Sequence, residues 1–360
     1  MNVINVMMFG GRRCGKTSVI AAMKGCFEDV FGENTNLDIN ISDIATMNVI
    51  DEKSAEINQY FVNKTRSIVM NKSYAATQGL MEYKLDICIK GKDGTTTLNL
   101  CDFPGEWLDK NHQDEQKTLQ SKIEHCNIII IAIDTVYLME KAANHKAESV
   151  GQYNERRNYC NHVANMVKDY FQVADGEPPK MIMFVPLKCE KYYNNGEMEL
   201  VKGRIHTAYK EIFNFAEENK DKYEIIIAPI LTLGKNTAEF SRFEYGDDGE
   251  IMLDKDLMIP SMPKYIFKDI SCSYSPKYCE QPLLYTLAYI LDLMQKAKNS
   301  EKVKAGLLKK FKLYILETYY DLASAQDFLE HKKIITGQLK IDNDGYEIIS
   351  DPLQLKEMTV

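Results

Sequence analysis

The sequence predicts an α/β fold in which a mostly parallel β-sheet carries helices on both faces. Three nearly continuous apolar runs, at residues 128–133, 181–185 and 225–230, are typical of strands that are covered on both sides, as parallel strands are. Helical or polar stretches separate most of the strand-like runs, which gives the alternation that this fold class requires. The pattern Gly10-x4-Gly15-Lys16-Thr17 stands between the first strand and the first helix, where such folds place a phosphate-binding loop, or P-loop.

The predicted elements follow one another in a regular order. Strands are expected at Val3–Phe9, Tyr83–Ile89, Thr95–Cys101, Ile128–Ile133, Met181–Val185 and Tyr223–Ile230. Only a short glycine-containing turn, residues 90–94, separates the second strand from the third, which predicts a hairpin and therefore one antiparallel strand in the sheet. After the last strand, Pro282 suits the first turn of a helix that runs to about Met294 and packs back on the sheet.

Three segments are longer than this alternation needs. We expect residues 1–299 to form one domain with insertions at about 28–80, 138–178 and 235–280. Helical character is expected at Ala45–Met70, and Pro260–Pro276 has the composition of a loop. Residues 300–360 are expected to form a C-terminal extension, with a helical segment followed by a small hairpin between Gly337 and Ser350.

The composition is that of a globular protein, with 45% hydrophobic and 27% charged residues in 360. A net charge of −8 argues against a protein built mainly to hold nucleic acid, so no nucleic acid is expected as a partner. The nine cysteines include no CxxC pair, which favours buried, reduced thiols in a cytoplasmic protein. No secretory signal is visible, and the longest apolar run, Ile128–Ile133, is too short for direct membrane insertion.

The strongest functional signal is the loop after the first strand. Its glycines let backbone N–H groups converge on phosphate, and the following helix points its positive end at the same anion. Lys16 would reach the β- and γ-phosphates, and Thr17 would ligate Mg²⁺. Arg12 and Arg13 could each face phosphate or solvent, and solvent is favoured. The residues expected to bind nucleotide here are Gly10, Gly11, Arg12, Arg13, Cys14, Gly15, Lys16, Thr17 and Ser18.

A second signal follows the third strand, where the sequence reads Asp102-Phe103-Pro104-Gly105. An aspartate at the carboxyl end of a sheet strand can hold Mg²⁺ through water, and the glycine lets its backbone N–H approach a γ-phosphate. The same residues could form an ordinary strand-ending turn. Their place behind a P-loop favours the functional interpretation.

Together these motifs resemble those of the Ras-like and Arf-like P-loop GTPases of the TRAFAC class, and the chain looks most similar to bacterial G domains of double-GTPase systems. The resemblance covers, in the same order, residues 2–27, 77–137, 180–190, 223–235 and 281–297. It implies a G domain that binds GTP and GDP with Mg²⁺ and acts as a switch for a protein effector or activator. It identifies no particular partner and leaves the oligomeric state open.

The resemblance also assigns single residues. Thr77 stands where Arf-like domains carry the switch I threonine, which completes the Mg²⁺ shell when the γ-phosphate is present; Thr65 is a weaker rival. Lys188 and Glu190 align with the lysine and the acidic residue of the base-reading Asn-Lys-x-Asp motif, while Leu187 replaces its asparagine. A carboxylate can accept hydrogen bonds from both N1–H and N2–H₂ of guanine, and adenine offers no such pair. Thr232–Lys235 takes the place of the last base-contacting loop, although a simple turn explains it equally well.

Hydrolysis is expected to be slow. Positioning and charge neutralisation by Lys16, Mg²⁺ and loop N–H groups would supply most of the rate. Glu106 directly follows Gly105, where many GTPases carry a water-orienting glutamine, and an ionised carboxylate accepts hydrogen bonds but donates none. Lys16, Gly105 and Glu106 are therefore the expected catalytic residues.

Two other functions stay open at this point. A P-loop ATPase would use Asp134, at the end of the apolar run 128–133, as its metal carboxylate in place of Asp102, but Thr135 follows where a catalytic glutamate would stand. A nucleotide-binding interaction module without useful hydrolysis would explain Glu106 and Leu187, and the insertions would then be partner surfaces.

Overall fold

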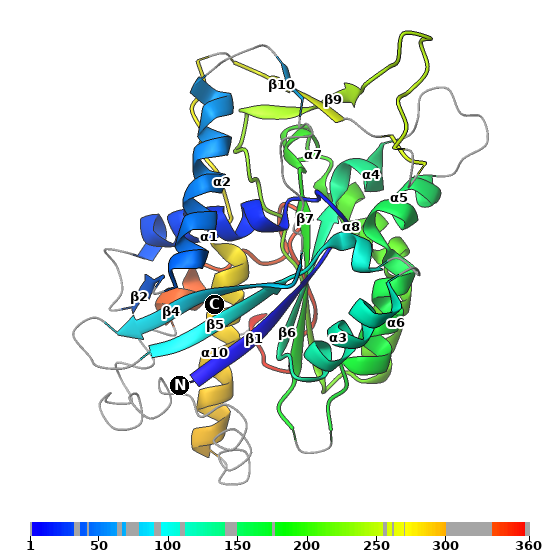
Figure 1. Cartoon of the computed structure of the whole chain (residues 1–360). Coiled ribbons are helices and arrows are strands. Elements are labelled where there is room, and N and C mark those ends of the chain that lie inside the picture. Colours follow the sequence, from blue (N-terminus) through cyan, green and yellow to red (C-terminus); the bar gives the residue numbers. More distant parts are fainter. Residues whose placement is uncertain are drawn as a thin grey trace.

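The computed structural model describes residues 2–31, 37–41, 43–62, 67–69, 79–89, 95–108, 112–140, 150–174, 177–254, 258–260, 263–269, 271–299 and 333–356. Within these residues, the main sheet has eight strands in the order β11-β8-β7-β6-β1-β5-β4-β2 (Figure 1). These are β1 (Asn2–Phe9), β2 (Leu37–Asn40), β4 (Met81–Ile89), β5 (Thr95–Asp102), β6 (Ile128–Asp134), β7 (Lys180–Leu187), β8 (Tyr223–Ile227) and β11 (Glu347–Ser350).

The strand directions confirm the predicted fold class. β5, β1, β6, β7 and β8 form a parallel group, and β4 pairs antiparallel with β5 in the predicted hairpin. At the two edges, β2 pairs antiparallel with β4, and β11 pairs antiparallel with β8. β6, β7 and β8 are buried along their whole length, as their apolar sequences predict, although β8 ends at Ile227 rather than at Ile230.

Helices cover both faces of the sheet, because alternate residues of a strand point to opposite sides. In β6, the even-numbered residues from Ile128 to Ala132 pack with α1 and α10, and the odd-numbered residues from Ile129 to Ile133 pack with α3, α6, α8 and α9. Figure 1 shows α1 and α10 on one side of the sheet and α3 and α6 on the other. These helices are α1 (Lys16–Phe31), α3 (Gln113–Glu124), α6 (Cys160–Tyr170), α8 (Met198–Ala208), α9 (Lys210–Glu218) and α10 (Gln281–Asn299).

A smaller sheet lies beyond the carboxyl ends of the main strands, at the top of Figure 1. Among the described residues it consists of β3 (Ser67–Val69), β10 (Pro263–Phe267) and β9 (Ala238–Phe243), all antiparallel, with β10 in the middle. Its core joins Phe240 and Tyr265 to Tyr137, which closely follows β6, and to Leu233, which follows β8. The neighbouring helices are α2 (Ile44–Val62), α4 (Thr135–Met139), α5 (Val150–Asn158) and α7 (Glu190–Asn194).

Two of the predicted insertions supply this small sheet. β3 comes from the 28–80 segment, and β9 and β10 come from the 235–280 segment. The predicted helical character of Ala45–Met70 is confirmed by α2 up to Val62 and is wrong over β3, and the loop prediction for Pro260–Pro276 is wrong over β10. β10 is stabilised by pairing with the distant β3 and by the complete burial of Tyr265, neither of which a local pattern reveals.

The C-terminal residues complete the main core. The expected hairpin at Gly337–Ser350 is not formed in the described residues: the chain turns at residues 342–345, but the strand that follows, β11, pairs with β8 at the edge of the main sheet. Tyr346 and Leu353 are fully buried in the core shared with α1 and α10. The helical prediction for residues 300–332 lies outside the described residues, and the division of the chain near residue 299 stays a prediction.

The cysteines match their predicted environment. The eight described cysteines are free thiols, and all except the half-buried Cys272 are buried. In the part of the chain that the structure describes, no helix has both the length and the apolar character needed to cross a bilayer.

Candidate nucleotide-binding site

The predicted phosphate-binding loop lies at the centre of the main sheet. β1 is flanked by β5 on one side and by β6 on the other, so the chain changes direction across the sheet at β1. In open α/β sheets, ligands bind beyond the carboxyl ends of the strands at such a switch point. Residues 10–15 connect β1 to the start of α1 at this place.

The backbone of this loop has the shape of an anion-binding nest. Gly10, Arg13 and Gly15 have positive φ angles of 152°, 59° and 116°. Such alternation turns successive N–H groups towards one concave side, and the start of α1 adds its own unpaired N–H groups. A Cβ atom on Gly11 would lie 1.9 Å from the Arg157 carbonyl oxygen, so only glycine fits there. Cys14 is buried and Ser18 is half-buried in the first turn of α1.

Lys16, Thr17 and Asp102 meet below the loop. The Lys16 ammonium donates to the Gly10 carbonyl oxygen at 2.9 Å and lies 3.4 Å from Asp102 Oδ1. The Thr17 hydroxyl donates to Asp102 Oδ2 at 3.3 Å. Burial lowers the pKa of Lys16, but Asp102, Cys14 and Glu106 together raise it above its ordinary value, so the ammonium stays charged. These oxygen ligands beside a fixed cation suit a magnesium–phosphate complex.

The turn after β5 packs directly on the loop. A Cβ atom on Gly105 would lie 2.1 Å from the Arg12 backbone nitrogen, so the predicted glycine is required by space. Glu106, in the short 3₁₀ helix η1 (Gly105–Leu108), is half-buried, and its Oε2 is a buried atom without a hydrogen-bond partner. Arg12 Nε is another such atom. Arg12 is thus half-buried rather than facing solvent, whereas the side chain of Arg13 is exposed.

Lys188 lies on the opposite side of the loop. Its ammonium contacts Asp134 Oδ2 at 2.7 Å and the Arg13 carbonyl oxygen at 3.0 Å. Lys188 has a positive φ of 57°, and only 7% of its surface is exposed. In this structure the lysine therefore supports the P-loop from behind. The Asp134 carboxylate is bound by Lys188, whereas Asp102 lies beside Lys16 and Thr17 at the start of α1.

Glu190 meets the loop after β8, as a base-reading residue would. Its Oε1 accepts a hydrogen bond from the Leu233 N–H at 2.9 Å, and its Oε2 is buried without a hydrogen-bond partner. Burial raises the pKa of Glu190 to about 7, against the lowering effect of the Leu233 hydrogen bond. Gly234, with φ 103°, leaves no room for a Cβ, which would lie 2.2 Å from the Ser275 carbonyl oxygen. Leu187 is buried beside Gly15.

Two predicted residues lie outside the part of the chain that the structure describes, and two residues near the loop were not predicted. Thr77 and its rival Thr65 both lie outside the described residues. Arg157 and Asn158, at the end of α5, contact Asp134 and were not predicted. They belong to the 138–178 insertion, and the sequence carries no motif that would have identified them.

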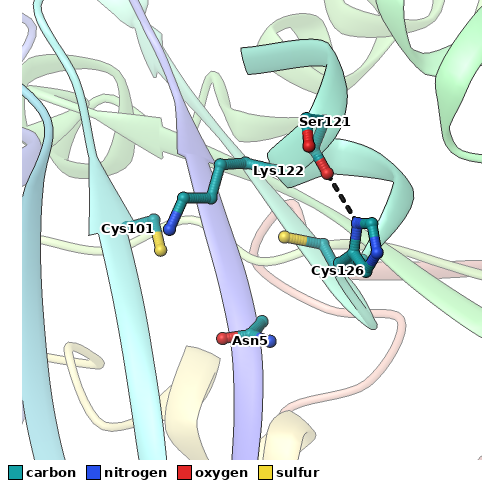
Figure 2. Close-up of a pocket in the computed structure, with 6 residues that line it drawn as sticks. Asn5, Cys101, Ser121, Lys122 and Cys126 are labelled. Atoms are coloured by element: carbon teal, nitrogen blue, oxygen red, sulfur yellow. Dashed lines mark hydrogen bonds between the residues drawn. The ribbon is translucent and has the colours of Figure 1, made fainter. Parts of the chain in front are cut away.

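A separate cavity lies on the flank of the sheet. Figure 2 shows its lining residues, among which His125 bonds to the Ser121 carbonyl oxygen and Lys122 extends towards Cys101. The cavity has a volume of about 260 Å³ and reaches Asn5 of β1, which is roughly 17 Å along the strand from Gly10. Burial raises the pKa of the Cys101 thiol to about 11, so the thiol stays protonated. The cavity is thus distinct from the P-loop site.

Comparison with known proteins agrees with the predicted resemblance. Residues 4–230 match the model of a family described as Double-GTPase 2. No curated protein is similar enough to this chain to count as a match.

Three solved structures overlap with the chain only in part. They are LeoA, a bacterial dynamin GTPase from ETEC (16% identity, TM-score 0.29), the GTPase-like domain of S. cerevisiae Ski7 bound to GDP and inorganic phosphate (10%, 0.31), and Methanosarcina barkeri Roco2 RocCORdC bound to GDP (12%, 0.24). The matches cover 64%, 63% and 64% of this chain and 30%, 43% and 44% of the three structures, respectively. This chain therefore spans less than half the length of each.

Proposed function

The chain belongs to the Double-GTPase 2 family and so carries a GTP-binding domain, and from this we propose that it is a Mg²⁺-dependent GTP switch. In this proposal it binds GTP and GDP, hydrolyses GTP slowly, and couples the nucleotide state to a protein partner. The observation that carries the proposal is that Lys16, Thr17 and Asp102 contact one another next to the P-loop.

The Lys16–Thr17–Asp102 group supports a bound Mg²⁺–triphosphate. Lys16 would exchange its hydrogen bond to the Gly10 carbonyl for contacts to phosphate oxygens. Thr17 would bind the magnesium directly, and Asp102 would hold it through water. The bound ion would neutralise charge on the phosphates, while the residues of the chain orient them for attack by water.

Discrimination of GTP from GDP would come from the turn at Gly105. This turn touches the P-loop at Arg12, so a γ-phosphate entering beside the loop would contact or displace it. Thr77 would add a second γ-phosphate sensor. Two such contacts can shift a switch between states only if they form with GTP and not with GDP. The partner would then distinguish the two arrangements, and the insertions are its proposed contact surfaces.

Slow hydrolysis is supported by the surroundings of Glu106. Its carboxylate can accept a hydrogen bond from the attacking water but, when ionised, cannot donate one to the phosphate. Arg12 Nε is a buried donor of the loop without a hydrogen-bond partner, and it would stabilise charge on the transferred phosphate. These features fit a measurable but weak intrinsic rate. A partner could supply a further cation.

Guanine recognition is assigned to Glu190. Its Oε2 is a buried acceptor without a hydrogen-bond partner, next to the loop that holds Leu233 and Gly234. A buried acceptor in this position stabilises a ligand that brings N–H donors, which guanine does and adenine does not. Since the described thiols are free and almost all buried, we also propose a cytoplasmic location.

The test is calorimetric titration of the purified chain with GTP, GDP and ATP in the presence of Mg²⁺, together with Lys16→Ala. The matched control is Lys117→Ala, since Lys117 is an exposed lysine on α3 that pairs with the exposed Asp114. We expect a preference for GTP over ATP of tenfold or more, about 1.4 kcal/mol, that Lys16→Ala abolishes and Lys117→Ala keeps. Preference for ATP would contradict the guanine assignment. Tight GTP binding without single-turnover hydrolysis would favour the interaction-module alternative.

A further inference from the structure

The 138–178 insertion reaches the back of the P-loop through the end of α5. Arg157, near the last residue of that helix, donates from its terminal nitrogen to the Arg13 carbonyl oxygen at 3.3 Å. Its own carbonyl oxygen packs so closely on Gly11 that no side chain fits between them. The guanidinium of Arg157 thus contacts the loop at Arg13, and its backbone carbonyl contacts the loop at Gly11. Only 8% of the Arg157 surface is exposed.

Arg157 and Lys188 share the same two acceptors. Asp134 Oδ2 accepts from Arg157 Nε at 3.2 Å and from its terminal nitrogen at 3.1 Å, and it also accepts from the Lys188 ammonium at 2.7 Å. Both cations also contact the Arg13 carbonyl oxygen. One buried carboxylate therefore holds two buried cations against one peptide group of the P-loop. The three side chains carry a net charge of +1 behind the loop that would bind the phosphates.

α5 is fixed to Asp134 by further contacts. Asn158 accepts a hydrogen bond from the Asp134 backbone N–H at 2.9 Å and donates to the Asp134 carbonyl oxygen at 3.3 Å. The Arg157 guanidinium also lies 4.7 Å from the centre of the Tyr137 ring. The end of the helix is therefore held in place independently of the Arg157 hydrogen bonds, and the guanidinium is presented to the loop in a fixed geometry.

The contact at Arg13 affects the orientation of the loop peptides. The carbonyl and the N–H of one trans peptide point in opposite directions. Holding the Arg13 carbonyl on the Lys188 side therefore points the Cys14 N–H back into the loop, where it contacts the Gly11 carbonyl oxygen at 3.2 Å. Arg13 itself is in the left-handed region at φ 59°, which a non-glycine residue adopts only when its surroundings compensate the strain.

We propose that Arg157 is a positioning residue for nucleotide binding, through which the 138–178 insertion maintains the P-loop in its anion-binding conformation. The proposal rests on the proposed GTP-binding function and adds a residue outside the motifs that defined the site. It also names a route of regulation: a partner that displaces the end of α5 would release the Arg13 carbonyl and weaken nucleotide binding. GTP and GDP would be affected equally, because the supported part of the loop does not contact the γ-phosphate alone.

The decisive experiment compares three variants with the wild type by calorimetric titration with GTP and with GDP. Arg157→Met removes both sets of hydrogen bonds but keeps the apolar stem, and Arg157→Lys keeps the charge with a single donor group. The matched control is Arg156→Met, since the neighbouring guanidinium donates to the Met258 carbonyl oxygen instead of the loop. Thermal unfolding without nucleotide is measured for each.

We expect Arg157→Met to raise the Kd of both nucleotides roughly tenfold or more, since hydrogen bonds from charged groups are the strong ones. Arg157→Lys is expected to fall between Arg157→Met and the wild type, and Arg156→Met to stay within about twofold of the wild type. A merely structural role would lower the unfolding midpoint of Arg157→Lys without changing its affinity when folded. If Arg157→Met does not fold, the nucleotide affinity of folded Arg157→Lys decides between the two roles.

Two results overturn the proposal, and they are distinguishable. A wild-type chain that binds neither GTP nor GDP removes the proposed function together with this inference. Wild-type binding with unchanged affinity in the folded Arg157 variants, or an equal loss in Arg156→Met, removes the inference alone.

Discussion

The Thr17 hydroxyl donates a hydrogen bond to Asp102 Oδ2 at 3.3 Å, although the two residues are 85 positions apart in the chain. The contact joins the start of α1 to the end of β5, and Lys16 lies on the other oxygen of the same carboxylate. Two motifs that the sequence shows only as separate patterns thus form one group of ligands. The charge of Lys16 and the oxygens of Thr17 and Asp102 are together suited to a phosphate-bound magnesium ion.

Asp102→Asn is expected to remove the effect of magnesium on GTP binding. The wild type should bind GTP roughly tenfold or more tightly with Mg²⁺ than with EDTA, and the variant should lose most of that difference, because an amide oxygen attracts the hydrated ion less than a carboxylate does. Calorimetric titration with and without Mg²⁺ measures the effect. Asp114→Asn is the control, since Asp114 is an exposed carboxylate on α3. An unchanged magnesium effect in Asp102→Asn would exclude Asp102 from the metal site.

Gly105→Ala is expected to weaken GTP binding roughly tenfold and to leave GDP binding nearly unchanged. The added Cβ would lie 2.1 Å from the Arg12 backbone nitrogen, so the turn must move away from the loop on the side proposed for the γ-phosphate. The same change at Gly203 of α8, where the new Cβ meets nothing within 4 Å, is the matched control. Equal losses for GTP and GDP would show that Gly105 acts on the loop as a whole and does not sense the γ-phosphate.

Arg12→Ala is expected to slow single-turnover GTP hydrolysis by roughly a hundredfold, the lower end of the usual effect of removing one donor to a developing charge. The half-buried Arg12 has a buried Nε without a hydrogen-bond partner, whereas a solvent-facing arginine would have it hydrated. Rapid-quench measurement at saturating GTP separates this effect from binding. Arg242→Ala, on an exposed position of β9, serves as the control. A rate equal to that of the wild type would show that Arg12 does not act on the transferred phosphate.

The parts of the site that follow directly from the sequence are those with a local backbone requirement. Gly10, Gly15, Lys16 and Thr17 were predicted from one short pattern between a strand and a helix, and the positive φ angles of the two glycines show the backbone requirement behind it. The prediction of Lys188 and Glu190 depended on the resemblance to known G domains, since a lysine and a glutamate after a strand do not by themselves indicate a base-binding role. Their contacts to Asp134 and Leu233 connect distant segments.

The contacts that the sequence did not predict are all non-local. Arg157 reaches the P-loop from an insertion whose pattern indicates only a helix, and nothing in that pattern specifies which face meets Arg13. β11 alternates as a hairpin strand would, and the same alternation suits pairing with β8 at the sheet edge. The choice between these partners depends on the burial of Tyr346 and Leu353 in the main core, which no short window of sequence contains.

The buried carboxyl group of Glu190 is expected to make stability depend on pH. Burial raises its pKa to about 7 in the folded chain, above its ordinary value of 4.5. The folded state therefore binds the proton more tightly than the unfolded state, and the free energy of unfolding falls as the pH rises from about 4.5 to about 7. Glu190→Gln should remove this loss and be more stable than the wild type at pH 8 by about 3 kcal/mol, since each pKa unit corresponds to about 1.4 kcal/mol. Urea unfolding at pH 5 and pH 8 gives the comparison.

Glu190 should also make base selectivity depend on pH: the preference for GTP over ATP should rise with pH, whereas the stability of the fold falls. Only the ionised carboxylate can accept both N–H donors of guanine, so the ratio of GTP to ATP affinity should rise roughly tenfold between pH 6 and pH 8 as the group with pKa near 7 ionises. Titrations at both pH values measure the ratio, and Glu190→Gln, which cannot ionise, should show a low ratio that is constant with pH. A pH-dependent ratio that persists in Glu190→Gln would assign the effect to another group and remove Glu190 from the base site.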